Sequence, residues 1–252
     1  MQKRTIIWLG LLTGWWPGIA TTAADTLVAE LLARYDRIET VTCDVRRDVR
    51  SGEGRMRWLS RVHFARGDRL HVENFAPLPR RIIADGTTMY QHSEGQPRGF
   101  RRPVADLTEA MTMGLRKVPG TVMDHLFRLA DVPEEHLPGT DDYPVRRAYT
   151  TDTLYVVLEA DATNRLRRLS LYDGDQRDEP TGEISLESFE EVQDGVWIPM
   201  LHRSRFNVGG VTHTETMRLG NYTVNAPIPD HLFDASAFFT DVQWVDRFED
   251  LD

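Results

Sequence analysis

Cysteine is almost absent from this chain of 252 residues, because Cys43 is the only one. A single cysteine cannot form an internal disulfide, so an apolar core must stabilise the folded state instead. We interpret Cys43 itself as a small buried residue. The chain also lacks a Gly-, Pro- or Ser-rich linker that would divide it. We therefore expect residues 25–252 to form one domain with a sizeable core.

Long apolar runs are equally scarce, and the one clear example lies near the start. Lys3 and Arg4 precede an apolar run from Ile6 to Trp16, and small residues follow up to Ala24. This order is typical of a secretory signal peptide, here residues 1–24. The run is too short to span a bilayer. No cysteine stands at the expected cleavage site to carry a lipid, so we expect an exported and soluble mature protein.

Basic residues are fewer than acidic ones. The chain has 30 Lys and Arg and 39 Asp and Glu, which gives a formal net charge of -9. The charge becomes -11 when Lys3 and Arg4 are removed with the signal peptide. So acidic a chain is disfavoured as a partner for nucleic acid or for an anionic membrane surface. The excess of carboxylates most plainly provides solubility.

Recognised catalytic motifs are missing as well, including a Gly-x-Ser-x-Gly elbow, a phosphate-binding Gly-rich loop and a His-Glu-x-x-His helix. His213 and Glu215 would share one face of a strand, but no third metal ligand stands at a recognisable spacing. The similar tetrapeptides at residues 124–127 and 230–233 are interpreted as chance, because adjacent residues on a helix do not face each other. We predict no enzyme activity, cofactor or metal. An esterase-like hydrolase using His213 or His231 is the weakest alternative.

The chain does contain apolar residues in two different periodicities. Between Asp25 and Ile38 they recur every three or four positions, which predicts an amphipathic helix. Residues 107–130 have the same period, and Pro119-Gly120 divides them into two short helices. Elsewhere apolar and polar residues alternate, which predicts strands with one wet face. These strands are predicted over residues 41–49, 56–64, 70–73, 154–158, 166–172, 183–189, 197–206 and 211–219.

The stretch RRIIADGTTMYQHSEG, residues 80–95, is predicted to be a further β-hairpin. Asp85-Gly86 stands between its two halves, and a tight turn of the required hand needs positive φ, which Gly tolerates. The polar, Arg-rich segment from Gln91 to Asp106 is predicted to be a loop.

Together these elements predict an α+β fold. Consecutive hairpins form a strongly curved antiparallel sheet, an open half-barrel, with an N-terminal helix and an inserted helical lid at residues 107–130. Short helices depend on packing for their stability. Met111, Met113 and Met123 suit a surface that repacks around variable apolar ligands. The acidic tail from about residue 240 is expected to be partly disordered, although Trp244 and Phe248 could dock.

Several stretches resemble the LolA family of periplasmic lipoprotein carriers and its wider lipoprotein-sorting superfamily. LLARYDRIETVTCDVRRDV, residues 31–49, is similar to the family's leucine-rich helix and first strand. VHFARGDRLHVEN, residues 62–74, and the hairpin at residues 80–95 resemble its basic-turn-strand and Asp-Gly-hairpin-aromatic segments. DGVWIPMLHRSRF and NYTVNAPIPDHLFD, residues 194–206 and 221–234, resemble its closing strands and final signature. Together they cover most of the mature chain.

This resemblance implies a periplasmic carrier whose apolar cavity, closed by helices, receives lipoprotein acyl chains or another lipid and transfers them towards the outer membrane. The implied partners are an inner-membrane donor and an outer-membrane acceptor protein, and we expect a monomer that needs no cofactor. Arg66 corresponds to the family's lid-contacting arginine, the lid latch, although Gly67 follows it where the family usually has proline. The implied lipid-binding residues are Met56, Trp58, Val62, Phe64, Leu70, Val72, Met89, Met111, Leu115, Met123, Leu126 and Phe127.

Two features depart from the standard carrier, namely the Arg-rich segment from Arg98 to Arg102 and the acidic tail. They leave open a paralogue with another apolar cargo. The alternative function is an envelope-sensing regulatory domain, because the sigma-factor regulator RseB resembles this fold. Such a domain would bind a partner protein and use lipid as a signal.

Overall fold

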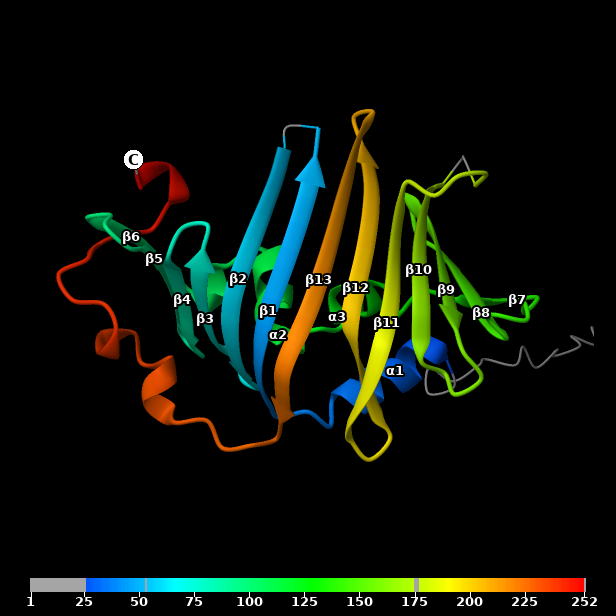
Figure 1. The fold of residues 1–252 in the computed structure, drawn as a ribbon, viewed down its shortest axis with the longest axis horizontal. Coiled ribbons are helices and arrows are strands. Elements are labelled where there is room, and N and C mark those ends of the chain that lie inside the picture. Colours follow the sequence, from blue (N-terminus) through cyan, green and yellow to red (C-terminus); the bar gives the residue numbers. More distant parts are fainter. Residues whose placement is uncertain (1–25, 53, 175–176, 252) are drawn as a thin grey trace, which may run out of the picture.

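The computed structural model describes residues 26–52, 54–174 and 177–251, so the predicted signal peptide lies outside the described residues (Figure 1). Short 3₁₀ helices lie at Val104–Asp106, Asp230–Phe233, Ala235–Ala237 and Phe248–Asp250. The other elements, in chain order, are α1 (Leu27–Tyr35), β1 (Thr40–Ser51), β2 (Gly54–Ala65), β3 (Arg69–Ala76), β4 (Arg80–Asp85), β5 (Thr88–Ser93), β6 (Arg98–Pro103), α2 (Glu109–Arg116), α3 (Met123–Leu129), β7 (Glu134–Leu137), β8 (Val145–Thr150), β9 (Leu154–Ala160), β10 (Leu166–Asp173), β11 (Gly182–Gln193), β12 (Val196–Val208), β13 (Val211–Val224) and β14 (Gln243–Val245).

The described strands form one continuous sheet in the order β14-β6-β5-β4-β3-β2-β1-β13-β12-β11-β10-β9-β8-β7. All neighbours are antiparallel except β14 and β6, which run parallel. The pairing of β1 with β13 joins the two halves of the sheet and places Val45 opposite Leu219. The sheet is open and curved (Figure 1). The predicted α+β class with a curved antiparallel sheet is therefore confirmed.

Strand alternation gives the sheet two different faces. Val41 and Cys43 of β1 and Val62 and Phe64 of β2 are buried on one side, and helices α1, α2 and α3 lie on this same side (Figure 1). We call it the helix face. Residues at the intervening positions, such as Arg61, point to the opposite side, which we call the outer face.

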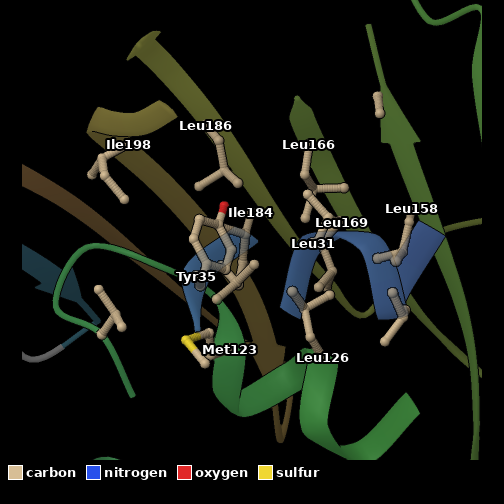
Figure 2. Close-up of a cluster of buried hydrophobic side chains, with 14 of the residues drawn as sticks. Leu31, Tyr35, Met123, Leu126, Leu158, Leu166, Leu169, Ile184, Leu186 and Ile198 are labelled. Atoms are coloured by element: carbon tan, nitrogen blue, oxygen red, sulfur yellow. The ribbon is translucent and has the colours of Figure 1, made fainter. Parts of the chain in front are cut away.

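The main core lies between the helix face and helices α1 and α3. Each buried aliphatic side chain in it contributes about 1.5–3 kcal/mol to folding. Both helices present apolar residues at the predicted three- to four-residue spacing, which is why they pack here. Buried side chains of this core include Leu31, Tyr35, Met123, Leu126, Leu158, Leu166, Leu169, Ile184, Leu186 and Ile198 (Figure 2).

A second, smaller apolar cluster lies at the β6 end of the helix face. Leu115 of α2 is buried in it, and Leu107 and Met111 pack against its edge. The sheet contributes Ala84, Met89 and Phe100. The helix face is therefore apolar along much of its width, from α1 to α2.

Residues 134–150 contain two strands, β7 and β8, that the apolar periodicity does not reveal. They are held to the rest of the fold by the carboxylate of Glu134, which is buried on the helix face. It accepts hydrogen bonds from the backbone N–H of Leu27 at 2.9 Å, from the Tyr149 hydroxyl at 2.5 Å and from Arg147 Nε at 2.9 Å. This network fixes the start of α1 against the edge of the sheet.

The prediction that Gln91 to Asp106 forms a loop is wrong. β5 continues to Ser93, and residues 98–103 form β6, which pairs with β5. The alternation of apolar and polar residues did not indicate this strand, because Phe100 is its only large apolar residue. Gly99 takes the opposite position, where a Cβ atom would lie 2.7 Å from the Trp244 ring. Tertiary packing, rather than alternation along the sequence, therefore defines this strand.

The acidic tail was expected to be partly disordered unless Trp244 and Phe248 dock, and in the structure both side chains contact the sheet. The segment crosses the outer face of β3 to β6, where Phe238 lies 4.8 Å from His71 and Trp244 lies 5.3 Å from Tyr90 between ring centroids. β14 then pairs with β6, and Phe248 stacks on Phe100 of the helix face at 4.0 Å. The tail thus passes round the edge of the sheet. Its aromatic residues pack on the sheet despite the acidic residues beside them.

Two histidines, His71 and His202, are buried, and no carboxylate of the described residues forms an ion pair with either. His71 is 3% exposed beneath Phe238, and burial, reinforced by the nearby Arg81, lowers the pKa of its imidazole to about 4. His202 lies on the helix face with Nε2 3.1 Å from the Pro199 carbonyl oxygen. Burial likewise lowers its pKa to about 4. Both side chains are therefore neutral in the folded protein near neutral pH.

We expect acidification to destabilise the protein before its carboxylates titrate. Between the ordinary histidine pKa of 6.5 and the folded value of about 4, the unfolded chain binds protons at His71 and His202 that the folded chain does not. The free energy of unfolding should be constant above about pH 7 and fall by on the order of 2 kcal/mol per histidine towards pH 4. Urea denaturation across this range measures the fall.

The double variant His71→Asn, His202→Asn should make this part of the curve less steep, whatever its stability near neutral pH. A smaller slope should remain, because burial also lowers the pKa values of His63 and His125. The variant His231→Asn is the matched control, because His231 is exposed. An equally steep curve in the double variant would contradict the assignment to these two groups.

Candidate functional site

The residues implied as lipid-binding all lie on the helix face or on helices α2 and α3, but the structure divides them into four groups. Val62, Phe64, Met123 and Leu126 belong to the main core. Met89 and Leu115 belong to the second cluster. Half-buried side chains pack at the edges of these clusters, namely Leu70, Val72, Met111 and Phe127. Met56 and Trp58 stand outside both clusters at the far end of β2.

In this conformation the helix face is filled by the protein's own side chains beneath α1 and α3. Met123 and Leu126 are both 0% exposed, and Figure 2 shows them pointing towards Tyr35, Leu31 and the strands. The cavity implied for this region is therefore not open here. Hollows among the described residues lie on the outer face, at the sheet edge and beside α1.

Helix α2 is the least firmly held cover of the helix face. Leu115 is its one fully buried residue, whereas Met111 and Met113 are half-buried and Gly114 is exposed. Its N-terminus is capped by the Thr108 hydroxyl. A helix of this length depends on its packing, so one buried leucine makes α2 the easiest element to displace.

The connection between α2 and α3 is, by contrast, firmly anchored. Gly120 has φ +79°, and a Cβ atom there would lie 2.2 Å from Leu219 Cδ1 of β13, so only glycine permits this approach. The Tyr222 hydroxyl donates to the Pro119 carbonyl oxygen at 2.6 Å. Lys117 forms an ion pair with Asp124 at 3.0 Å. Movement of α2 would therefore leave this connection and α3 in place.

The turn between β2 and β3 holds both α1 and α2. Arg66 donates from Nε to the Ile38 carbonyl at 2.9 Å and from Nη2 to the Tyr35 carbonyl at 2.8 Å, at the C-terminal end of α1. Asp68 accepts from Arg116 of α2 through both oxygens, at 2.9 and 3.2 Å. The implied latch residue Arg66 thus contacts α1, while the neighbouring Asp68 contacts α2.

The far end of the helix face, around Met56, is open to solvent. Met56 is 48% exposed, and Trp58 is half-buried with the Arg80 guanidinium 5.7 Å from its ring centre. Arg47 and Glu215 form a bidentate ion pair here, with two contacts of 2.7 Å. This end combines apolar surface with charged groups, a composition suited to the head of an amphipathic molecule.

The metal and acid-histidine motifs considered from the sequence take ordinary structural roles. Glu215 is engaged by Arg47, and the described part of the chain contains no group of three or more His, Cys, Asp or Glu that could hold a metal. Asp230 pairs with Arg69. Cys43 is buried as predicted, and burial raises the pKa of its thiol to about 12.

Sequence reasoning missed Asp68, Arg116 and Arg47, which hold α2 and the open end of the helix face. Their partners lie far away along the chain, and nothing in the local pattern indicates the pairing. The turn Arg66-Gly67-Asp68 was the available signal, since a turn beside an inserted helical segment is well placed to contact it.

Comparison with known proteins gives matches in structure but not in sequence. Neither a family model nor a curated protein matches the chain. Among the described residues, no helix is both long and apolar enough to cross a membrane.

Three solved structures resemble the fold. A DUF1329 family protein from Desulfovibrio piger has a TM-score of 0.55 at 12% identity, over 84% of this chain and 96% of that one. A LolA superfamily protein from Nitrosomonas europaea has 0.53 at 13%, over 83% and 98%. An outer membrane lipoprotein-sorting protein domain from Vibrio parahaemolyticus has 0.55 at 11%, over 85% and 98%. The chain therefore has a LolA-like fold.

Proposed function

We propose that the protein is a periplasmic carrier that binds lipoprotein acyl chains, or those of another lipid, on the helix face. One observation carries the proposal. An open sheet presents an apolar face whose main covers, among the described residues, are three short helices, of which α2 buries one leucine. The LolA-like fold supports it, because two of the similar structures are a LolA superfamily protein and a lipoprotein-sorting domain.

The physical need for such a carrier is set by the hydrophobic effect. Exposing an acyl chain to water costs about 0.8 kcal/mol per methylene, so a lipid anchor cannot cross an aqueous compartment unaided. A surface that exchanges its own apolar contacts for those of the cargo lowers this cost. No bond is made or broken in this process, so the proposed activity needs neither a catalytic residue nor a cofactor.

Because the helix face is closed in this conformation, the proposal requires two states. In the closed state α2 covers the second cluster, and in the open state α2 is displaced. Displacing α2 removes Leu115 and Met111 from the second cluster and costs a few kcal/mol of burial, on the order of 2–3 kcal/mol for the leucine. An acyl chain that takes their place restores this burial. Cargo binding therefore shifts the population towards the open state. The anchored Gly120 turn keeps α3 and the main core in place.

The polar surroundings of Met56 suit the head of the cargo. A chain lying under α2 would extend along the helix face towards Trp58 and the Arg47–Glu215 pair. We propose that a membrane-bound donor and an outer-membrane acceptor meet the protein at this end and that it acts as a monomer.

A first test is the binding of a fluorescent acyl probe. Trp58→Glu should weaken binding by about tenfold or more, because a carboxylate would have to be buried against the cargo. Trp197→Glu is the matched control, since Trp197 is also half-buried but lies on the outer face. Fluorescence titration and thermal unfolding are measured on both variants.

Equal loss of probe binding in both variants would assign the effect to stability and not to the site. No saturable uptake of the probe, or of a radiolabelled lipoprotein, by the unaltered protein would contradict the carrier proposal itself.

A second test concerns the hold of Asp68 on α2. Asp68→Asn should raise the rates of probe uptake and release by up to about fivefold, because an exposed ion pair contributes at most about 1 kcal/mol. Asp230→Asn removes a comparable exposed Arg–Asp pair that does not contact α2, and it should leave these rates unchanged. Stopped-flow fluorescence measures both. Identical rates in the unaltered protein and Asp68→Asn would contradict a moving α2.

A further inference from the structure

The outer face of the four central strands carries a cluster of arginines that the acidic composition of the chain conceals. They alternate with inward-pointing residues along each strand and so lie on one surface. The C-terminal segment packs on β3 to β6 and leaves this surface open. We call it the arginine patch, and it consists of Arg46, Arg50, Arg55, Arg57, Arg61, Arg203, Arg205 and Arg218.

The register places several of these like charges directly opposite each other. Arg50 faces Arg55 across β1 and β2, and Arg46 faces Arg218 across β1 and β13. Directly opposed like charges destabilise a sheet. The arrangement is costly in the isolated protein and becomes favourable when an anion lies over it.

Carboxylates within the patch neutralise it only in part. Asp48 accepts from Arg57, Arg55 and Arg46 at 2.8, 3.2 and 3.0 Å, which leaves one negative charge for three positive ones. Asp44 pairs with Arg61, and Glu187 pairs with Arg203. Among the described residues no carboxylate lies within ion-pair distance of the remaining three, which are Arg50, Arg205 and Arg218.

A hollow of about 370 Å³ lies within the patch. Its lining contains one carboxylate, that of Asp48, together with two threonines, Thr214 and Thr216, and five arginines, Arg46, Arg50, Arg55, Arg203 and Arg218. Guanidinium forks and hydroxyls are the groups that bind phosphate oxygens, and the fork does so with two parallel hydrogen bonds. The chemistry of this hollow therefore matches a phosphate group.

The neighbouring surface indicates that the phosphate belongs to a membrane. A second hollow of about 400 Å³ adjoins the first, and its lining includes three arginines and one carboxylate, Arg46, Arg61, Arg218 and Asp44, together with the apolar Leu59 and Phe75. Leu59 and Phe75 are 38% and 48% exposed. Basic groups interleaved with exposed apolar side chains match the headgroup region of a bilayer, where charges meet phosphates and apolar groups reach the acyl boundary.

We propose that the arginine patch docks the protein onto an anionic phospholipid surface through the lipid phosphates. This docking is independent of the proposed acyl-chain binding on the helix face, because the two surfaces lie on opposite sides of the sheet. It differs from the expectation based on net charge, since attraction at short range depends on the local charge and is screened within about 10 Å.

Vesicle sedimentation of the full chain tests the docking. The unaltered protein should bind vesicles of phosphatidylglycerol and phosphatidylcholine, should not bind vesicles of phosphatidylcholine alone, and should be released as ionic strength rises from about 0.05 to about 0.5 M. The triple variant Arg50→Gln, Arg205→Gln, Arg218→Gln should lose at least about tenfold in vesicle affinity. The matched control is Arg37→Gln, Arg101→Gln, Arg128→Gln, three exposed arginines elsewhere.

Each outcome decides the proposal. Equal loss in both triple variants, or vesicle binding that ignores anionic lipid, would overturn it. Tight binding of inorganic phosphate without vesicle binding would assign the hollow to a free anion, and tight binding of an acidic peptide alone would assign it to a protein partner. The acyl-probe assay on the same variants should remain unchanged, so failure of the carrier proposal and failure of the docking proposal remain distinguishable.

Discussion

An open sheet with one apolar face must have that face covered, and this constraint governs the structure. The helix face is too wide for a single helix, so α1 and α3 cover the main core and α2 covers the second cluster. The cover is uneven. α1 is fixed at its start by Glu134 and at its end by Arg66, whereas α2 depends on Leu115 and one exposed ion pair. The part of the helix face under α1 is therefore firmly covered, whereas the part under α2 can be uncovered more easily.

Local sequence pattern was sufficient to predict most of the sheet. Alternation located β1, β2 and β9 to β13, and the Asp85-Gly86 turn located the β4–β5 hairpin, because each of these strands buries one side against the core. β6, β7, β8 and β14 could not be found in this way. Each is short, and contacts distant in the sequence decide its conformation, such as Trp244 over Gly99 or Tyr149 with Glu134.

For the candidate site, too, the sequence predicted one part and left another undetermined. The residues named as lipid-binding that belong to strands lie on one face of the sheet, since strand alternation fixes the direction of each side chain. Which of them are buried could not be read from the sequence, because Met123 and Met56 are chemically alike yet differ in how the helices cover them. The overall charge was similarly uninformative about the outer face, since an average over the chain does not reveal that the sheet gathers arginines from four separate strands.

The strand order also determines when the protein can finish folding. β1 lies at the centre of the sheet but pairs with β13, and β6 at the edge pairs with β14, so both contacts wait for residues 211–245. Pairing between distant segments slows folding. Until residues 211–245 are available for pairing, β1 and β6 keep unpaired edges that can join other strands. A chain that ends before β13 would therefore be prone to aggregate.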